Sequence, residues 1–351
     1  FEIPHRNDIY IINPSMRKYL EVSVAISKIA LRYIAPEDLH QYSVDEFFMD
    51  VTNSYHRFSS TVQSFCQKLQ FEIKEETGIN CSIGIGSNML LSKIAMDVEA
   101  KHTKSLIAEW RYQDVPKKLW PIQPLREFWG ISRKIEAKLN KRGIFTIGDL
   151  AHYPHQYLKR DLGVIGVDLH LHANGIDQSR VRDKYRVMNP SICKSQILMR
   201  DYRYEESKVV MRELIEDVAS RVRGRNQLAR TIHFSFGYSD EGGINKQYTL
   251  EEPTNLEDSI FKVVEYFADK LCDRTALIRT VSISLTQFIE ETDRQLNLFI
   301  DEYERKRNEK LAKTIDALHR KFGRGIVSKA ASYTEAGTKH GRLGLMAGHK
   351  M

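Results

Sequence analysis

Apolar residues recur at helix and strand spacing in the first third of the chain. Steps of three and four residues predict a helix after Pro14, and an aromatic and β-branched run predicts a hairpin over 39–51. The same rules predict, in order, a helix over 62–73, a strand over 81–85, a helix over 90–100 and a strand over 105–110. The predicted order is therefore α-β-β-α-β, followed by one more helix and strand.

A second α/β pattern begins after Pro190. It contains, in order, a strand over 192–199, a helix over 210–222, strands over 232–238 and 246–250, a helix over 256–271 and a strand over 281–285. This β-α-β-β-α-β order is that of a ferredoxin-like fold. The first pattern lacks only the leading strand, which in a shared topology would lie centrally, beside the strands that flank Asp45. We therefore expect an N-terminally truncated domain; the alternative is a rearranged sheet that never had this strand.

Between the two patterns, from Val115 to Lys184, short helical segments alternate with prolines and glycines, which indicates a small helical domain. The sequence thus predicts an α+β multidomain protein: a ferredoxin-like domain without its first strand, a helical domain, a second ferredoxin-like (βαββαβ) domain and a basic C-terminal tail. The expected domain boundaries are 1–114, 115–188, 189–290 and 291–351.

Composition narrows the class of protein. With 351 residues, of which 42% are hydrophobic and 28% charged, the chain is too long for one core and too apolar to be disordered. No apolar run approaches the roughly 20 residues that cross a bilayer, and no signal peptide opens the chain, so a cytoplasmic location without membrane contact is expected. The 4 cysteines lie far apart without a CxxC pair, which predicts reduced thiols in the cores rather than a disulfide framework or a zinc ribbon.

The net charge of +7 is concentrated in two stretches. Residues 302–351 carry 12 Lys/Arg against 5 Asp/Glu, and residues 117–142 carry 8 against 2. Such stretches favour a polyanionic partner. The alternative is that both are solvated helix faces.

Ser43-Val44-Asp45-Glu46 has the spacing of a helix-capping box. Residues 47–51, which follow, are aromatic and β-branched and favour a strand instead. Neighbouring side chains on a strand face opposite ways, so Asp45 and Glu46 can converge only at a turn such as a hairpin tip. Two carboxylates there would suit Mg²⁺, which is commonly bound by one or two carboxylates and substrate phosphates.

The glycine-containing run 84–86 links a predicted strand to the helix that carries Lys93 and ends near Lys101. The glycines most simply form a tight strand-to-helix turn, with Ser87 or Asn88 as the N-cap. Lys101 has two interpretations, because it can complement the helix dipole or supply a cation for a triphosphate.

Three of these segments, 42–46, 81–86 and 92–97, resemble the palm of Y-family translesion DNA polymerases, and most closely the UmuC-like UV-damage-repair branch. The resemblance implies that Asp45 and Glu46 bind the two catalytic Mg²⁺ ions and that Lys101 contacts the incoming deoxynucleoside triphosphate. Some relatives are one residue shorter before this lysine.

The family also has a third metal-binding aspartate on a first palm strand, a steric gate against ribonucleotides and a fingers segment. The sequence contains no counterpart of these features. Without the third aspartate, the chain as given is expected to bind Mg²⁺ poorly and to polymerise little or not at all.

The helical domain resembles the family's thumb, with its helix-hairpin-helix. Backbone amides after a glycine, with basic side chains beside them, suit sequence-independent phosphate binding. The DNA-binding residues that this resemblance implies are Gly130, Ile131, Ser132, Arg133, Lys134 and Gly143. An ordinary packing unit with solvated lysines is the alternative.

By the same resemblance the second α/β domain is the little finger, which grips duplex DNA. Its strands present hydroxyl side chains such as Thr231 and Ser282, and Arg223, Arg225 and Arg230 lie in a cluster without acidic residues. These groups suit phosphate contacts rather than base reading. A solvent-facing sheet would have the same pattern.

A pentapeptide after the last predicted strand resembles the clamp-binding motif of bacterial polymerases. Its Gln295, Leu296, Leu298 and Phe299 would dock on the sliding clamp (β subunit). A buried tail segment is the alternative, and the sequence indicates no role for the basic tail beyond it.

Together these features predict an error-prone translesion DNA polymerase, which would extend a primer opposite damaged template by two-metal phosphoryl transfer. Its partners would be primer-template DNA, deoxynucleoside triphosphates and the sliding clamp, and it is expected to be a monomer. One alternative is a non-catalytic DNA- and clamp-binding protein derived from such a polymerase. Another is a nucleotidyl cyclase or similar palm-bearing enzyme, against which the helix-hairpin-helix and the clamp motif argue.

Overall fold

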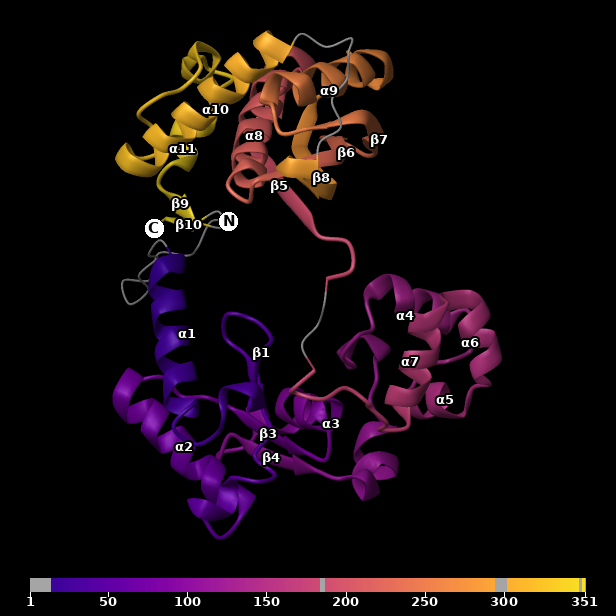
Figure 1. Cartoon of the computed structure of the whole chain (residues 1–351). Helices are drawn as coiled ribbons and strands as arrows, with labels where there is room; N and C mark the ends of the chain where they lie inside the picture. The colour runs from indigo at the N-terminus through magenta and orange to yellow at the C-terminus, as the bar shows by residue number, and fades with distance from the viewer. Residues whose placement is uncertain (1–13, 184–186, 294–301, 347–348, 351) are drawn as a thin grey trace, which may run out of the picture. The chain divides into compact units, whose positions relative to one another are not determined.

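The computed structural model describes residues 14–183, 187–293, 302–346 and 349–350 (Figure 1). The chain divides into two compact units, of which the first spans Met16–Tyr185 and the second contains the described residues from Val187 onward. No helix in these described ranges is both long enough and apolar enough to cross a membrane.

The first half of unit one follows the predicted element order. It contains α1 (Met16–Ala30), β1 (Leu39–Gln41), β2 (Phe47–Met49), α2 (Val62–Thr77), β3 (Ile83–Gly86), α3 (Met89–Ile94) and β4 (Ile107–Trp110). Local chemistry sets the ends of α2, because Thr61 and Ser64 form a capping box and Gly78 ends the helix at φ +73°. The helix buries Phe65 and Leu69 among its apolar residues.

The strands of this region form two separate pairs. β1 and β2 are antiparallel, β3 and β4 are parallel, and neither β2 nor β3 has a second strand partner within the described ranges. A groove of about 1760 Å³ is lined by residues of β2, β3, α1 and α2, including the apolar Ile26, Phe65, Leu69 and Ile85. Among the described residues, the apolar groove therefore borders two strands that each have an edge without a strand partner.

The second half of unit one is helical. Its helices are α4 (Arg133–Asn140), α5 (Ile147–His152), α6 (His155–Leu162) and α7 (Val164–Ala173). Leu90, Leu91 and Ile94 of α3 belong to the same buried cluster as Leu139 and Leu169 of these helices. The expected boundary between residues 114 and 115 therefore does not separate two hydrophobic cores.

Unit two contains the predicted β-α-β-β-α-β order. Its elements are β5 (Ser191–Tyr202), α8 (Tyr204–Arg223), β6 (Gln227–Tyr238), β7 (Gly243–Thr254), α9 (Glu257–Leu271) and β8 (Ile278–Glu290). They form one antiparallel sheet in the order β5-β8-β6-β7. The ferredoxin-like arrangement expected here is wrong, because that arrangement places the first strand centrally and β5 lies at the edge.

β8 is one of the two inner strands of this sheet, and it pairs with β5 on one side and with β6 on the other. Leu285 of β8 is opposite both Ile192 and Ile232, and all three are fully buried. On the face toward the helices, β8 has Val281, Ile283 and Leu285 at successive alternate positions, whereas the paired positions of β5 include Lys194 and Gln196. The more continuous apolar pattern of β8 fits its place between two strands.

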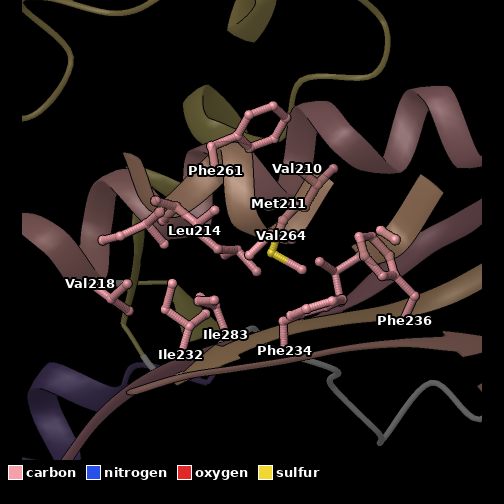
Figure 2. Packing of buried hydrophobic residues seen from close by; sticks show 14 of the residues in the cluster. Val210, Met211, Leu214, Val218, Ile232, Phe234, Phe236, Phe261, Val264 and Ile283 are labelled. Atoms are coloured by element: carbon pink, nitrogen blue, oxygen red, sulfur yellow. The ribbon is translucent and has the colours of Figure 1, made fainter. Parts of the chain in front are cut away.

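The core of unit two lies between the sheet and the helices α8 and α9 (Figure 2). Leu214 and Val218 of α8 and Val264 of α9 meet Phe234 and Ile283 of the sheet, each at most 1% exposed. Burying a side chain of this size stabilises the fold by roughly 1.5–3 kcal/mol.

The basic tail folds back onto α8. It forms α10 (Glu302–Phe322), α11 (Lys339–Arg342) and the short strands β9 (Leu345–Met346) and β10 (His349–Lys350). Arg342 pairs with Glu213 of α8, and Lys339 pairs with Glu216. Part of the tail's positive charge is therefore neutralised within the protein, which the sequence did not indicate.

The cysteines are all free thiols, as expected. Cys66 and Cys272 are buried, and burial raises the pKa of Cys66 to about 12 and that of Cys272 to about 11. Cys193 on β5 is exposed, so the prediction that the thiols lie in cores is wrong for this residue.

Candidate active site and nucleic-acid interface

Asp45 and Glu46 lie in the turn between β1 and β2. The backbone amides of Tyr42 and Ser43 both donate to the carbonyl of Glu46, which closes the hairpin. The capping-box interpretation is therefore wrong, and the predicted hairpin is present. The Asp45 side chain is exposed and accepts a hydrogen bond of 2.7 Å from the Ser43 hydroxyl.

Glu46 begins a chain of alternating charges that leads along α3. Both of its carboxylate oxygens lie 2.8 Å from the ammonium of Lys93. Lys93 also lies 3.0 Å from Asp97, whose other oxygen accepts from Lys101 at 2.6 Å. The three sequence-predicted residues Asp45, Glu46 and Lys101 are thus brought to one region of the groove, which they line together with Lys93.

Lys93 is the residue of this site that sequence reasoning missed. It is only 8% exposed. Burial lowers its pKa, but hydrogen bonds to Glu46 and Asp97 outweigh this effect, so the pKa of Lys93 is raised and the side chain stays charged. The signal available in the sequence was the spacing of Lys93, Asp97 and Lys101, because residues four apart on a helix are neighbours.

The extra residue noted before Lys101 has a structural counterpart. Residues Ala95–Glu99, directly after α3, form a π-helical segment. A π-helix contains one more residue per hydrogen-bonded turn, so it can absorb a single-residue insertion without breaking the helix. Lys101 consequently still faces Asp97, with its side chain 47% exposed and open to a ligand.

Gly84 and Gly86 of β3 allow the backbones of β3 and α3 to pack closely together. A Cβ on Gly84 would lie 1.9 Å from the Ser92 carbonyl oxygen, and one on Gly86 would lie 2.2 Å from the Ser92 amide nitrogen. Asn88 caps α3 by accepting from the Leu91 amide at 2.8 Å. The strand-to-helix turn expected from the sequence is therefore the interpretation that the structure supports.

The hairpin carboxylates fit Mg²⁺ in their chemistry, since that ion prefers oxygen ligands. They do not fit it in number, because Lys93 already binds both oxygens of Glu46. The described ranges contain no group of three His, Cys, Asp or Glu side chains that could hold a metal ion. Asp45 and Glu46 alone therefore do not complete a Mg²⁺ site.

The helical half of unit one presents a basic surface around α4. Gly130 adopts φ +94° before this helix, and Ser132 caps it by accepting from the Ile135 amide. Arg133 and Lys134 are exposed and have no ion-pair partner among the described residues. Ile131 is 5% exposed, so only its backbone is available to a phosphate.

The same surface continues past the end of α4. Lys134, Lys138 and Lys141 follow one another at four- and three-residue steps, and all three are exposed. Gly143, at φ +77°, turns the chain toward α5. A basic stripe next to an open helix N-terminus is suited to contacts with a phosphate backbone.

The hairpin and this helical region are in direct contact. Trp129, which precedes Gly130, donates from its indole nitrogen to the Tyr42 hydroxyl at 3.0 Å. The two rings also meet edge to face at 5.7 Å. The carboxylate-bearing hairpin is therefore held against the start of the basic surface.

In unit two, one face of the sheet is covered by small polar side chains. Thr231 is opposite Thr286, His233 is opposite Ser284, and Ser235 is opposite Ser282. The hydroxyls of Ser235 and Ser282 lie 2.7 Å apart. The predicted hydroxyl face is therefore present, opposite the face that packs on α8 and α9.

The three arginines predicted to contact DNA differ in exposure. Arg225 and Arg230 are exposed. Arg223 is 5% exposed and binds Asp316 of α10 at 2.7 Å and Glu257 at 2.6 Å. The prediction for Arg223 is therefore wrong, because its guanidinium is already paired inside the fold. The predicted clamp-binding residues Gln295, Leu296, Leu298 and Phe299 lie outside the described residues.

Three segments of the chain match models of one protein family, and curated proteins are similar over its length. Residues 2–97 match the impB/mucB/samB family, residues 112–144 its helix-hairpin-helix (HHH) motif, and residues 189–298 its C-terminal domain. The UV-damage repair protein UvrX of Bacillus subtilis (strain 168) is 40% identical over 100% of this chain and 83% of its own length. The chain belongs to the Y family of DNA polymerases.

Other members of the Y family are similar over nearly the whole chain. DNA polymerase IV 2 of Bacillus subtilis (strain 168) is 33% identical over 97% of this chain and 82% of its own length. Among solved structures, the Y-family DNA polymerase chimera Dbh-Dpo4(243-245)-Dbh matches with a TM-score of 0.62 at 21% identity, covering 79% of this chain and 78% of that one. This last likeness concerns the fold alone.

Proposed function

We propose that this Y-family protein is a translesion DNA polymerase, which transfers a deoxynucleotide from its triphosphate to a primer 3′-hydroxyl opposite damaged template and releases pyrophosphate. The observation that carries the proposal is the convergence of Asp45, Glu46 and Lys101 on one groove, beside a basic surface in the same unit. The names of its relatives, a UV-damage repair protein and DNA polymerase IV, support the same reaction and context.

Each group has a proposed role. Asp45 and Glu46 are two of the carboxylates of the Mg²⁺ site, with at least one further ligand from outside the described residues. Lys101 contacts the triphosphate, for which its ammonium must leave Asp97. Gly130, Ser132, Arg133, Lys134 and Gly143 bind the DNA backbone, as do Arg225 and Arg230 of unit two.

The open groove suggests what the site lacks. β2 and β3 each have an edge with no strand partner among the described residues, and an extended segment could pair with the backbone donors and acceptors there. A strand there would cover the half-buried Ile26 and Ile83, which line the groove, and would place its own side chains beside Asp45 and Glu46. We propose that polymerase activity requires such a strand, and that the described residues alone bind DNA without extending a primer.

Primer extension tests this proposal. The chain alone would be compared with the chain joined to the part of UvrX that lies outside the aligned region, on undamaged and lesion-bearing templates with Mg²⁺. We expect extension only by the joined form, and loss of extension in its Asp45→Ala variant. Extension that survives Asp45→Ala would overturn the assignment of the hairpin as the site.

A non-catalytic DNA- and clamp-binding protein is the second candidate, because the metal-ligand set of the described residues is incomplete. It predicts that both forms bind primed DNA and that neither extends a primer. For the clamp, binding of the full chain to purified β subunit would be measured by surface plasmon resonance. A Leu298→Ala/Phe299→Ala variant should lose this binding while its affinity for DNA is unchanged.

A further inference from the structure

Helix α10 has an inward face that is firmly held. Ala312 and Asp316 are buried against the domain, and Asp316 binds Arg223 through both carboxylate oxygens. Arg305 pairs along the helix with Glu302 and Glu309. The orientation of α10 about its own axis is therefore set by buried contacts, so its opposite face must point away from the domain.

The outward face of α10 is basic. Lys306, Arg307, Lys310 and Lys321 are exposed and have no ion-pair partner among the described residues. At 3.6 residues per turn they lie opposite Ala312 and Asp316. We call these four residues the α10 basic stripe.

Small residues separate the cations of this stripe. A shallow surface depression of about 490 Å³ is lined by Lys306, Glu309, Lys310, Lys313, Thr314 and Ala317. Its glutamate is already paired with Arg305, and Lys313 is paired with Glu291. No bulky side chain lies in the depression, so an extended, negatively charged chain could approach the helix closely.

The repulsion between the cations of the α10 basic stripe destabilises the isolated helix. Like charges four residues apart, as at Lys306 and Lys310, oppose helix formation by about 0.2–0.5 kcal/mol per pair. A polyanion would reverse the sign of this interaction. The stripe runs over 15 residue steps, or roughly 22 Å, a length over which duplex DNA presents about a dozen phosphate charges.

We propose that the α10 basic stripe binds the sugar-phosphate backbone of duplex DNA without regard to sequence. The inference rests on the proposed function in supposing that DNA is the natural ligand of this protein. A protein partner fits less well, because lysine is depleted at protein interfaces. Lysine is a regular contact of the phosphate backbone. Helix α10 would then pack against unit two through its inward face and bind DNA through its outward face.

The test is the salt dependence of duplex binding by the full chain. Lys306→Gln/Lys310→Gln removes two cations of the stripe, and Lys262→Gln/Lys270→Gln removes two exposed cations of α9 as a matched control. Each phosphate contact contributes about 0.9 to the slope of log K against log salt. We expect the stripe variant to lower this slope by about 2 and to bind about tenfold more weakly at low salt. The control should keep the wild-type slope.

Circular dichroism of the stripe variant should match the wild type, which excludes unfolding as the cause. An unchanged slope would overturn the inference, and so would an equal loss in the α9 control. Weaker binding to heparin with unchanged binding to duplex DNA would show a different polyanion and would also overturn it. The readout needs neither Mg²⁺ nor primer extension. Failure of the polymerase proposal would therefore appear separately, as DNA binding without extension.

Discussion

The palm region and the little finger have similar orders of helices and strands, but their strands are joined into sheets differently. Residues 187–290 form one four-stranded sheet, and two helices seal one of its faces. In residues 16–110 the strands remain as two pairs beside a groove of about 1760 Å³. The two predicted orders differ by one strand, and within the described residues only the little finger joins its strands in a single continuous sheet.

The two regions also use charge differently. The little finger encloses the ion pairs of Arg223, and one face of its sheet presents hydroxyl side chains. The palm places its charges at the edge of the groove, where Glu46, Lys93, Asp97 and Lys101 alternate. Buried pairs therefore serve structure in one region, whereas partly exposed pairs mark the candidate site in the other.

Replacing a buried phenylalanine by alanine should lower the free energy of unfolding by different amounts in the two cores, and this is the largest difference that we expect. Phe234→Ala in the closed core should cost about 3–5 kcal/mol, because the cavity cannot relax. Phe65→Ala should cost about 1–2 kcal/mol less, because its side chain already borders the groove. Hydrogen exchange would report on β6, and tryptophan fluorescence in urea would report on the palm, since all 3 tryptophans lie in unit one. Equal losses would contradict the comparison.

Removing the buried arginine should be nearly as severe. Arg223→Ala leaves Asp316 and Glu257 without their partner, and breaking a buried pair in this way costs about 3–5 kcal/mol. The exposed Arg225 provides a matched control, for which Arg225→Ala should change stability by less than about 0.5 kcal/mol. Thermal unfolding monitored by circular dichroism compares the two, and similar melting temperatures would contradict the assigned burial.

Acid should weaken the contacts that hold the tail to the rest of unit two. Burial raises the pKa of Asp217, but Lys194, Arg324 and Arg342 outweigh burial, so its pKa is lowered from 3.8. Asp316 behaves in the same way through Arg223. A lowered native pKa gives stability that is present above the unfolded value and is lost as pH falls through the native one. Hydrogen exchange in α10 should therefore accelerate below about pH 3.8; exchange that stayed constant down to pH 2 would refute this.

The Lys93–Glu46 ion pair at the palm groove should contribute less to stability than Arg223 does, and more than the exposed Lys101 does. Lys93→Met leaves Glu46 without its partner and should cost about 1–3 kcal/mol. Lys101→Met removes a more exposed pair and should cost at most about 1 kcal/mol. Urea unfolding followed by tryptophan fluorescence separates the two variants, and an equal effect would show that Lys93 is not specially placed.

The smallest effect on stability is expected at the N-terminal cap of helix α4. Ser132→Ala removes the side-chain acceptor of the Ile135 amide and should cost about 1 kcal/mol, whereas Ser132→Gly should cost only a few tenths. Fluorescence-monitored unfolding measures both variants. Greater loss from glycine than from alanine would indicate that this residue acts through something other than capping.

Prediction from the sequence worked where a signal was local. The order of elements in both regions follows from apolar residues at steps of two, three or four, and these periods depend only on backbone geometry. The hairpin at Asp45 and the cap at Asn88 also follow from a few neighbouring residues. The candidate carboxylates and Lys101 were found because the family places its motif within such short segments.

The tertiary structure decided what depends on distant residues. That β8 rather than β5 pairs with β6 depends on contacts between strands that are far apart in the sequence. Arg223 and Asp316 are 93 residues apart, so sequence proximity to Arg225 gave no sign that one is buried and the other exposed. Lys93 likewise meets Glu46 across 47 residues. The sequence by itself thus determined the elements and the chemistry available on them, because both are short-range properties. Which charges remained free to meet a ligand was decided by packing, because desolvation and pairing depend on the whole fold.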